Sequence, residues 1–172
     1  MGNTHGVVIT THCACWNVDS LNYSGIAQTD IDNGTFVTLG DIMNTDGVID
    51  EYTFNVTPDA NGTSTIKYIV DSPIVGSTLE MQLHNDPRYH YNVAGEPMSI
   101  KQLIVGDSMK FIAENFEEGA SPTDHPTYKT AGIGATGKLK MEDGAGNFKL
   151  LGKTVIPIGQ EQVPAYLFRL EA

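Results

Sequence analysis

Tyr52-Thr53-Phe54-Asn55-Val56 indicates the fold class most directly, because apolar and polar residues alternate along it. Successive side chains of an extended strand point to opposite faces, so Tyr52, Phe54 and Val56 are expected to share one face. Other short segments rich in β-branched and aromatic residues follow at roughly regular spacing. They are residues 7–12, 36–39, 65–70, 78–83, 108–113, 128–130, 138–141, 149–156 and 166–170. The sequence therefore predicts a mainly β protein, a β-sandwich or β-barrel of short antiparallel strands.

Tight turns separate the predicted strands, and helix is scarce. Pairs of Asn or Asp with Gly tolerate the positive φ angles of hairpin turns, and four such pairs occur between strands. They are Asn33-Gly34, Asp46-Gly47, Asn61-Gly62 and Asp143-Gly144. The best helical candidate is Pro97–Leu103, where proline suits the first position of a helix of two turns at most. We therefore expect no more than one short helix.

The chain divides into an irregular N-terminal segment and a β-rich remainder. Its 172 residues are enough to bury a core within one domain. The stretch from residue 13 to residue 34 is polar and irregular, so we expect residues 1–32 to form an extended N-terminal arm. Residues 33–172 are expected to form an all-β domain. The polar loop 117–126 is a candidate sub-boundary before a carboxy-terminal hairpin region.

The charge of the chain excludes several classes of partner. Asp and Glu number 21 against 10 Lys and Arg, which gives a net charge of −11. A generic nucleic-acid binder needs a cationic face for phosphates, and an anionic membrane attracts basic segments, so we expect neither partner. The first basic residue is Lys67, and the preceding 66 residues carry 8 of the acids. This acidic third either keeps the protein soluble or meets a basic partner.

The beginning of the chain lacks the pattern of a secretory signal, because the apolar run at residues 7–9 is short and no cationic residue precedes it. No window approaches the roughly 20 apolar residues of a membrane-spanning helix. We therefore expect assembly in a reducing cytoplasm. Cys13 and Cys15 are two positions apart, and a disulfide between them would close a strained ring, so we expect free thiols.

A glycine-rich segment, Gly132–Lys138, matches the G-x-G-x-x-G pattern and the first seven positions of a P-loop. A P-loop needs a hydroxyl residue next, but Leu139 follows. Both motifs also need a helix after the glycines to bind phosphate at its N-terminus. Residues 138–141 instead alternate as a strand does, so we predict a glycine-rich β-turn and no nucleotide cofactor.

Candidate metal ligands and nucleophiles are sparse. His12, Cys13 and Cys15 are soft-ligand types, but a tetrahedral site needs a fourth ligand and usually wider spacing. Asp30 and Asp32 share one face if extended, yet a solvated turn explains them better than a Ca²⁺ site. No local signature of a catalytic cysteine or serine surrounds the thiols. We expect no catalytic residue, metal or cofactor, and leave open whether His12, Cys13 and Cys15 do more than pack in the core.

A wider pattern runs through residues 33–172 as an ordered series of short β motifs. The motifs are Asn33–Leu39, Glu51–Pro58, Tyr68–Pro73, Ala94–Glu96, Leu103–Phe111, Tyr128–Thr130 and Gly137–Leu139. Their order resembles small structural proteins of tailed bacteriophages, of the head-decoration or capsid-cement type. The resemblance implies a non-enzymatic protein that binds the outer surface of a capsid and stabilises it. The implied partners are the lattice of the major capsid protein and further copies of this chain, on the capsid exterior of the virion after assembly in the host cytoplasm.

The apolar side chains of the N-terminal segment are our candidates for capsid or subunit contact. They are Val7, Val8, Ile9 and Trp16. An extended arm carrying them can add a strand to the sheet of a neighbouring subunit. The resemblance does not cover this segment.

Three alternatives stay open. A tail-tube or head-fibre component would polymerise without a capsid. A β-sandwich module that binds a carbohydrate would need a concave face with exposed aromatic residues, and the chain has a single Trp. An enzyme would need chemistry at Cys13 or Cys15.

Overall fold

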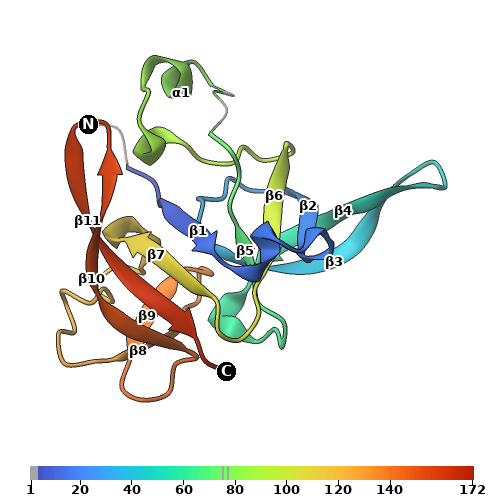
Figure 1. Ribbon diagram of the computed structural model, residues 1–172. Coiled ribbons are helices and arrows are strands. Elements are labelled where there is room, and N and C mark those ends of the chain that lie inside the picture. The colour runs from blue at the N-terminus through green and yellow to red at the C-terminus, as the bar shows by residue number, and fades with distance from the viewer. Residues whose placement is uncertain (1–3, 75, 77) are drawn as a thin grey trace.

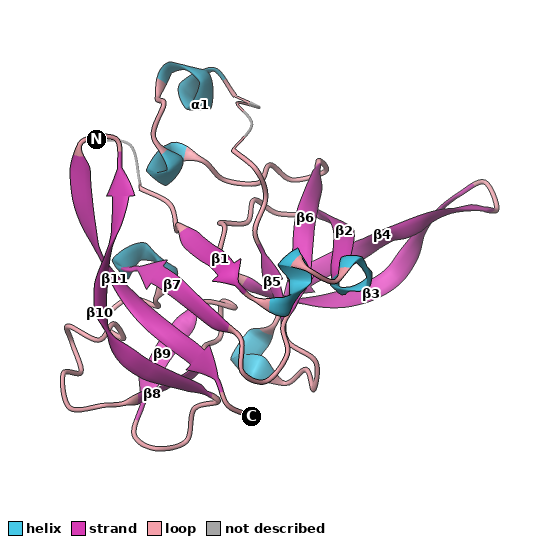
Figure 2. Cartoon of the chain, in the orientation of Figure 1, coloured by secondary structure: helices cyan, strands magenta, loops and turns pink. Residues whose placement is uncertain are grey.

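The fold is mainly β, as predicted, and is described for residues 4–74, 76 and 78–172 of a computed structural model (Figures 1 and 2). The strands are β1 (Val8–His12), β2 (Asn22–Ala27), β3 (Phe36–Thr45), β4 (Val48–Pro58), β5 (Tyr68–Val70), β6 (Pro97–Gln102), β7 (Ser108–Ile112), β8 (Thr130–Ile133), β9 (Leu139–Glu142), β10 (Phe148–Ile158) and β11 (Glu161–Leu170). They form a closed five-stranded barrel, ordered β2-β4-β3-β5-β6, and a six-stranded sheet, ordered β1-β7-β11-β10-β8-β9. The pairings between these strands are antiparallel except the β2–β4 pair, which is parallel.

Helical structure in the described residues consists of one short α-helix and single 3₁₀ turns. The helix is α1 (Leu79–Leu83), and the turns are η1 (Ala14–Trp16), η2 (Asp19–Leu21), η3 (Ala60–Gly62), η4 (Pro87–Tyr89) and η5 (Ala113–Asn115). The expectation of at most one short helix is confirmed, but the expected position was wrong. Thr78 caps α1 by accepting a hydrogen bond at Oγ1 from the Met81 amide, over residues that we expected to be a strand. None of these helices is long and apolar enough to cross a membrane.

The predicted helix at Pro97–Leu103 is strand β6. Met98 and Ile100 are both buried and lie on one face of the strand. β6 pairs with β2 on one side and β5 on the other, which closes the barrel. Proline is tolerated here because it is the first residue of the strand.

The two sheets share one core. Phe36 of β3 is fully buried and packs against Phe111 of β7 and Phe148 of β10, with ring centroids 6.2 and 5.0 Å away. The barrel interior holds a second cluster that includes Val37 and Ile100. A third cluster, around Ile112 and Ile156, covers the other side of the six-stranded sheet. Because one cluster draws on both sheets, we treat the chain as one folding unit.

The N-terminal region is not an extended arm, which corrects our expectation for residues 4–32. β1 pairs with β7 at the edge of the six-stranded sheet, and β2 pairs with both β4 and β6 inside the barrel. The barrel therefore draws on residues 22–102, and the six-stranded sheet on residues 8–12 and 108–170. The division between the sheets falls at residues 103–107, not after residue 32 or within 117–126.

Strands β3 and β4 extend well beyond the barrel as a hairpin (Figure 1). Asp46 and Gly47 form its turn with φ angles of 53° and 84°, as the sequence predicted for this pair. Pairing of β3 with β5 involves only Phe36 and Val37, and pairing of β4 with β2 begins at Thr53. Residues 41–52, which we call the projecting hairpin, are therefore a two-stranded ribbon.

Candidate interaction surface

The two thiols are unsuited to nucleophilic or metal chemistry. Cys13 and Cys15 are free, as predicted, and both are buried. Burial raises the pKa of both thiols, and the carboxylate of Asp107 raises the pKa of Cys13 further. Both therefore stay protonated at neutral pH, whereas the thiolate is the reactive form. The neighbouring His12 is exposed, and no group of three or more His, Cys, Asp or Glu within the described residues is placed to hold a metal ion.

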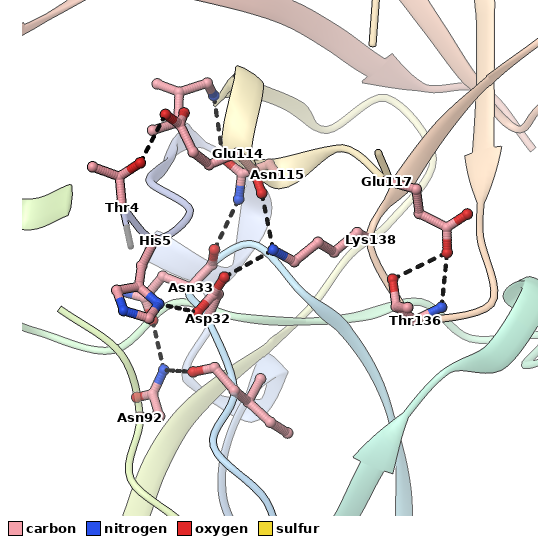
Figure 3. Close-up of polar contacts among 12 residues, drawn as sticks. Thr4, His5, Asp32, Asn33, Asn92, Glu114, Asn115, Glu117, Thr136 and Lys138 are labelled. Carbon is pink, nitrogen blue, oxygen red and sulfur yellow. Dashed lines mark hydrogen bonds and ion pairs between the residues drawn. The ribbon is translucent and has the colours of Figure 1, made fainter. Parts of the chain in front are cut away.

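Asp30 and Asp32 have separate structural roles. The Asp32 carboxylate accepts a hydrogen bond from Lys138 Nζ at 2.9 Å and lies 2.7 Å from His5 Nδ1 (Figure 3). Burial alone would raise the pKa of Asp32, but Lys138 and His5 hold it below its usual value. Asp30 instead accepts a hydrogen bond from the amide of Ala94. The two carboxylates thus serve separate contacts within the chain.

Near Asp32, the buried side chains of Asn33, Asn92 and Asn115 form a group of hydrogen bonds between the two sheets (Figure 3). We call this group the Asn115 junction. Asn115 Nδ2 donates to the carbonyl of Asn33 at 2.8 Å, and Asn115 Oδ1 accepts from the Ile112 amide at 3.1 Å. Asn92 Nδ2 donates to the carbonyl of Ile31 and to Asn33 Oδ1. Since these groups satisfy one another, the junction holds the sheets together rather than forming a ligand site.

The glycine-rich segment forms a hairpin turn at residues 134–138, as predicted, while Gly132 and Ile133 belong to β8. It joins β8 to β9, and the Gly134 amide donates to the carbonyl of Lys138. Gly137 has a φ of 78°, and a Cβ there would lie 2.6 Å from the carbonyl oxygen of Phe36. The Lys138 ammonium is bound by Asp32, so this segment presents no phosphate cradle.

The N-terminal contact candidates lie largely within the fold. Val7 and Val8 are buried, and Ile9 is partly buried against the Ile112 cluster, so the apolar run that suggested an anchor instead packs the core. Trp16 is 57% exposed but fixed in place. Its Nε1 donates to Thr10 Oγ1 at 3.0 Å, and Lys101 Nζ lies 3.6 Å from its ring centroid. Val7 and Val8 are therefore not available to a partner, and Ile9 is accessible only in part.

The projecting hairpin exposes large apolar side chains that sequence reasoning missed. Ile42, Val48, Ile49 and Tyr52 are 39, 72, 55 and 67% exposed. Tyr52 was expected to share a face with Phe54 and Val56, but Val56 is buried and Phe54 is partly buried. A bulge between Ile49 and Phe54 and a φ of 65° at Tyr52 break the alternation. The Asp46-Gly47 pair predicted a hairpin turn here, but it did not show that the hairpin extends beyond the barrel.

The acidic character of the N-terminal third is concentrated on this hairpin. Of the 8 acids among the first 66 residues, 4 lie between residues 41 and 51. Asp41, Asp46 and Asp50 are exposed and form no ion pair within the described residues. The hairpin therefore combines exposed apolar side chains with unpaired negative charge, as a protein-binding element does.

The short helix α1 carries a smaller group of exposed apolar side chains. Leu79 and Leu83, four residues apart on the helix, are 71 and 73% exposed. Because α1 lies away from the projecting hairpin (Figure 1), substitutions of these two leucines can serve as controls for substitutions in the hairpin.

Comparisons of the chain with models of protein families, with curated proteins and with solved structures find no match.

Proposed function

We propose that the chain is a non-enzymatic structural protein that coats the outer surface of a tailed-phage capsid and stabilises its lattice. The observation that carries the proposal is the projecting hairpin, which presents Val48, Ile49 and Tyr52 to solvent on a ribbon of two strands. The resemblance of residues 33–172 to head-decoration proteins supplies the class of assembly.

The physical properties of the hairpin support a role in assembly. A two-stranded ribbon is marginally stable in water by itself, and its outer edges offer unpaired backbone groups. Burying aliphatic side chains against a neighbour contributes about 25 cal/mol for each Å² removed from water. A neighbouring protein in a lattice therefore stabilises a segment that the barrel leaves uncovered.

The rest of the molecule suits a structural role. Phe36 ties the barrel to the six-stranded sheet, and the Asn115 junction adds buried hydrogen bonds between them. A body of this kind anchors the hairpin at its base, which limits the loss of conformational entropy on binding.

Co-sedimentation with capsids of the phage that encodes the chain tests the proposal. We expect the wild-type protein to pellet with capsids and the double variant Val48→Ser/Ile49→Ser to stay in the supernatant. The matched control is Leu79→Ser/Leu83→Ser, which removes two apolar side chains elsewhere that are at least as exposed, and it is expected to pellet normally. Failure of the wild-type protein to bind, or equal binding by all three proteins, contradicts the proposal.

A tail-tube or head-fibre component is the second candidate, because a hairpin can also join subunits of a tube. Such a component would form long polymers without capsids. Size-exclusion chromatography of the purified protein separates the candidates, since the capsid-coating role predicts monomers or small oligomers.

A further inference from the structure

A groove with a volume of about 320 Å³ lies beside β10. Its lining combines aliphatic and basic side chains and contains no acid: Pro122, Pro126, Lys129, Leu150, Leu151, Gly152 and Lys153. Both lysines are exposed, and Leu151 is 44% exposed. The groove therefore offers an apolar floor with two positive charges at its rim.

A bulge in β10 creates this surface. Leu150 pairs with Phe168 and Gly152 pairs with Leu167, so Leu151 has no partner on β11. Bulges of this kind re-aim a side chain and increase the local twist. A Cβ at Gly152 would meet no atom within 4 Å, which shows that the groove is open beside the bulge.

The tip of the projecting hairpin is complementary to this groove in chemistry. In its sequence from Asp46 to Asp50, one exposed carboxylate precedes the exposed Val48 and Ile49 and one follows them. Two acids that flank aliphatic residues thus match two lysines that flank an aliphatic floor. Such matching favours the correct partner and register of binding.

The tip cannot reach the groove of its own chain. Figure 1 places the end of the hairpin and strand β10 at opposite sides of the molecule. A contact between them must therefore join two copies head to tail, which builds rings or open chains.

We propose that the hairpin tip of one copy docks into the β10 groove of a second copy. The inference rests on the proposed function, and it names the partner of the hairpin as the neighbouring copy on the capsid surface. One tip buries little area, so the contact is weak between free molecules. On a lattice that holds copies side by side, the effective concentration rises to roughly the mM range and the contact becomes populated.

Engineered cysteines test the contact directly. Val48→Cys and Leu151→Cys proteins, mixed under mild oxidation, are expected to form a disulfide-linked dimer on a non-reducing gel. The matched control replaces Leu151→Cys with Val105→Cys, at a residue 65% exposed outside the groove. Native Cys13 and Cys15 are buried, so they interfere little. Equal dimer yields with the groove cysteine and the control cysteine would overturn the inference.

A charge-reversal cycle provides the second readout. Asp50→Lys and Lys153→Glu, each combined with the cysteine pair, are expected to lower the rate of cross-linking about tenfold, and the two reversals together to restore it. If capsids bind the wild-type protein while neither test shows a contact between copies, the inference fails and the proposed function stands. If copies cross-link but bind no capsid, the proposed function fails alone.

Discussion

The ring centroids of Phe36 and Phe148 lie 5.0 Å apart. This contact joins β3, the strand that leads into the projecting hairpin, to β10 of the six-stranded sheet. Both side chains are fully buried. The strand that reaches out to the solvent-exposed hairpin tip is thus anchored at its base in the shared core.

The shared core predicts one cooperative unfolding transition. Phe148→Ala removes a ring that touches the barrel, so we expect a loss of about 3–5 kcal/mol in the free energy of unfolding. Trp16 fluorescence and far-ultraviolet circular dichroism during urea unfolding should give the same midpoint. Two separate transitions in the wild-type protein would show that barrel and sheet fold independently.

The Asn115 junction predicts a large loss of stability when Asn115 is replaced by an apolar residue of similar size. Asn115→Leu leaves the Asn33 carbonyl and the Ile112 amide without their partner, and each unsatisfied buried group costs about 1–3 kcal/mol. We expect the free energy of unfolding in urea to fall by roughly 2–6 kcal/mol. The control is Asn17→Leu, at an exposed residue. Similar stabilities for the two variants would contradict the structural role of the junction.

The lowered pKa of Asp32 predicts the direction of a pH effect. A carboxyl whose pKa is lower in the folded state than in the unfolded chain stabilises the fold above the unfolded value, about 3.9. That stabilisation is lost as the pH falls from this value through the folded pKa, because the proton then breaks the contact with Lys138. Urea midpoints between pH 2 and 7 should therefore fall more steeply for the wild-type protein than for Asp32→Asn. Parallel curves would show that Asp32 contributes nothing to acid sensitivity.

Burial of the thiols predicts low reactivity. Because burial raises the pKa of Cys13 and Cys15, few thiolates are present at pH 8. A disulfide reagent such as Ellman's should label the folded protein far more slowly than the protein in urea. Rapid labelling of the folded protein would mean that these cysteines are accessible, and would reopen a chemical role for them.

The strands with one buried face could be predicted from the sequence, and those that depend on distant contacts could not. β1 was predicted because residues 7–11 are all β-branched, and Val8 and Thr10 are its buried positions. β2 was missed because glycine is uncommon in strands, yet Gly25 lets Ile100 approach, where a Cβ would lie 2.3 Å from Ile100 Cδ1. The barrel closes only because β2 sits between β4 and β6, a pairing that no local pattern encodes.

The burial of the N-terminal contact candidates could not be predicted, for a related reason. Val7 and Val8 are apolar at the beginning of the chain, and composition alone does not distinguish an anchor from an edge strand of the core. Val48 and Ile49 are equally apolar, but they are exposed because the barrel ends at Thr53. The acidic bias of the first 66 residues was the sequence signal nearest to the projecting hairpin.

Hydrogen–deuterium exchange of the hairpin amides, with and without capsids, tests the central claim most directly. Binding through the projecting hairpin predicts that amides of residues 41–52 exchange rapidly in the free protein and become protected on capsids. Amides around α1, whose exposed Leu79 and Leu83 have no proposed partner, should exchange equally in both states. Unchanged exchange in the hairpin of a capsid-bound protein would contradict the account.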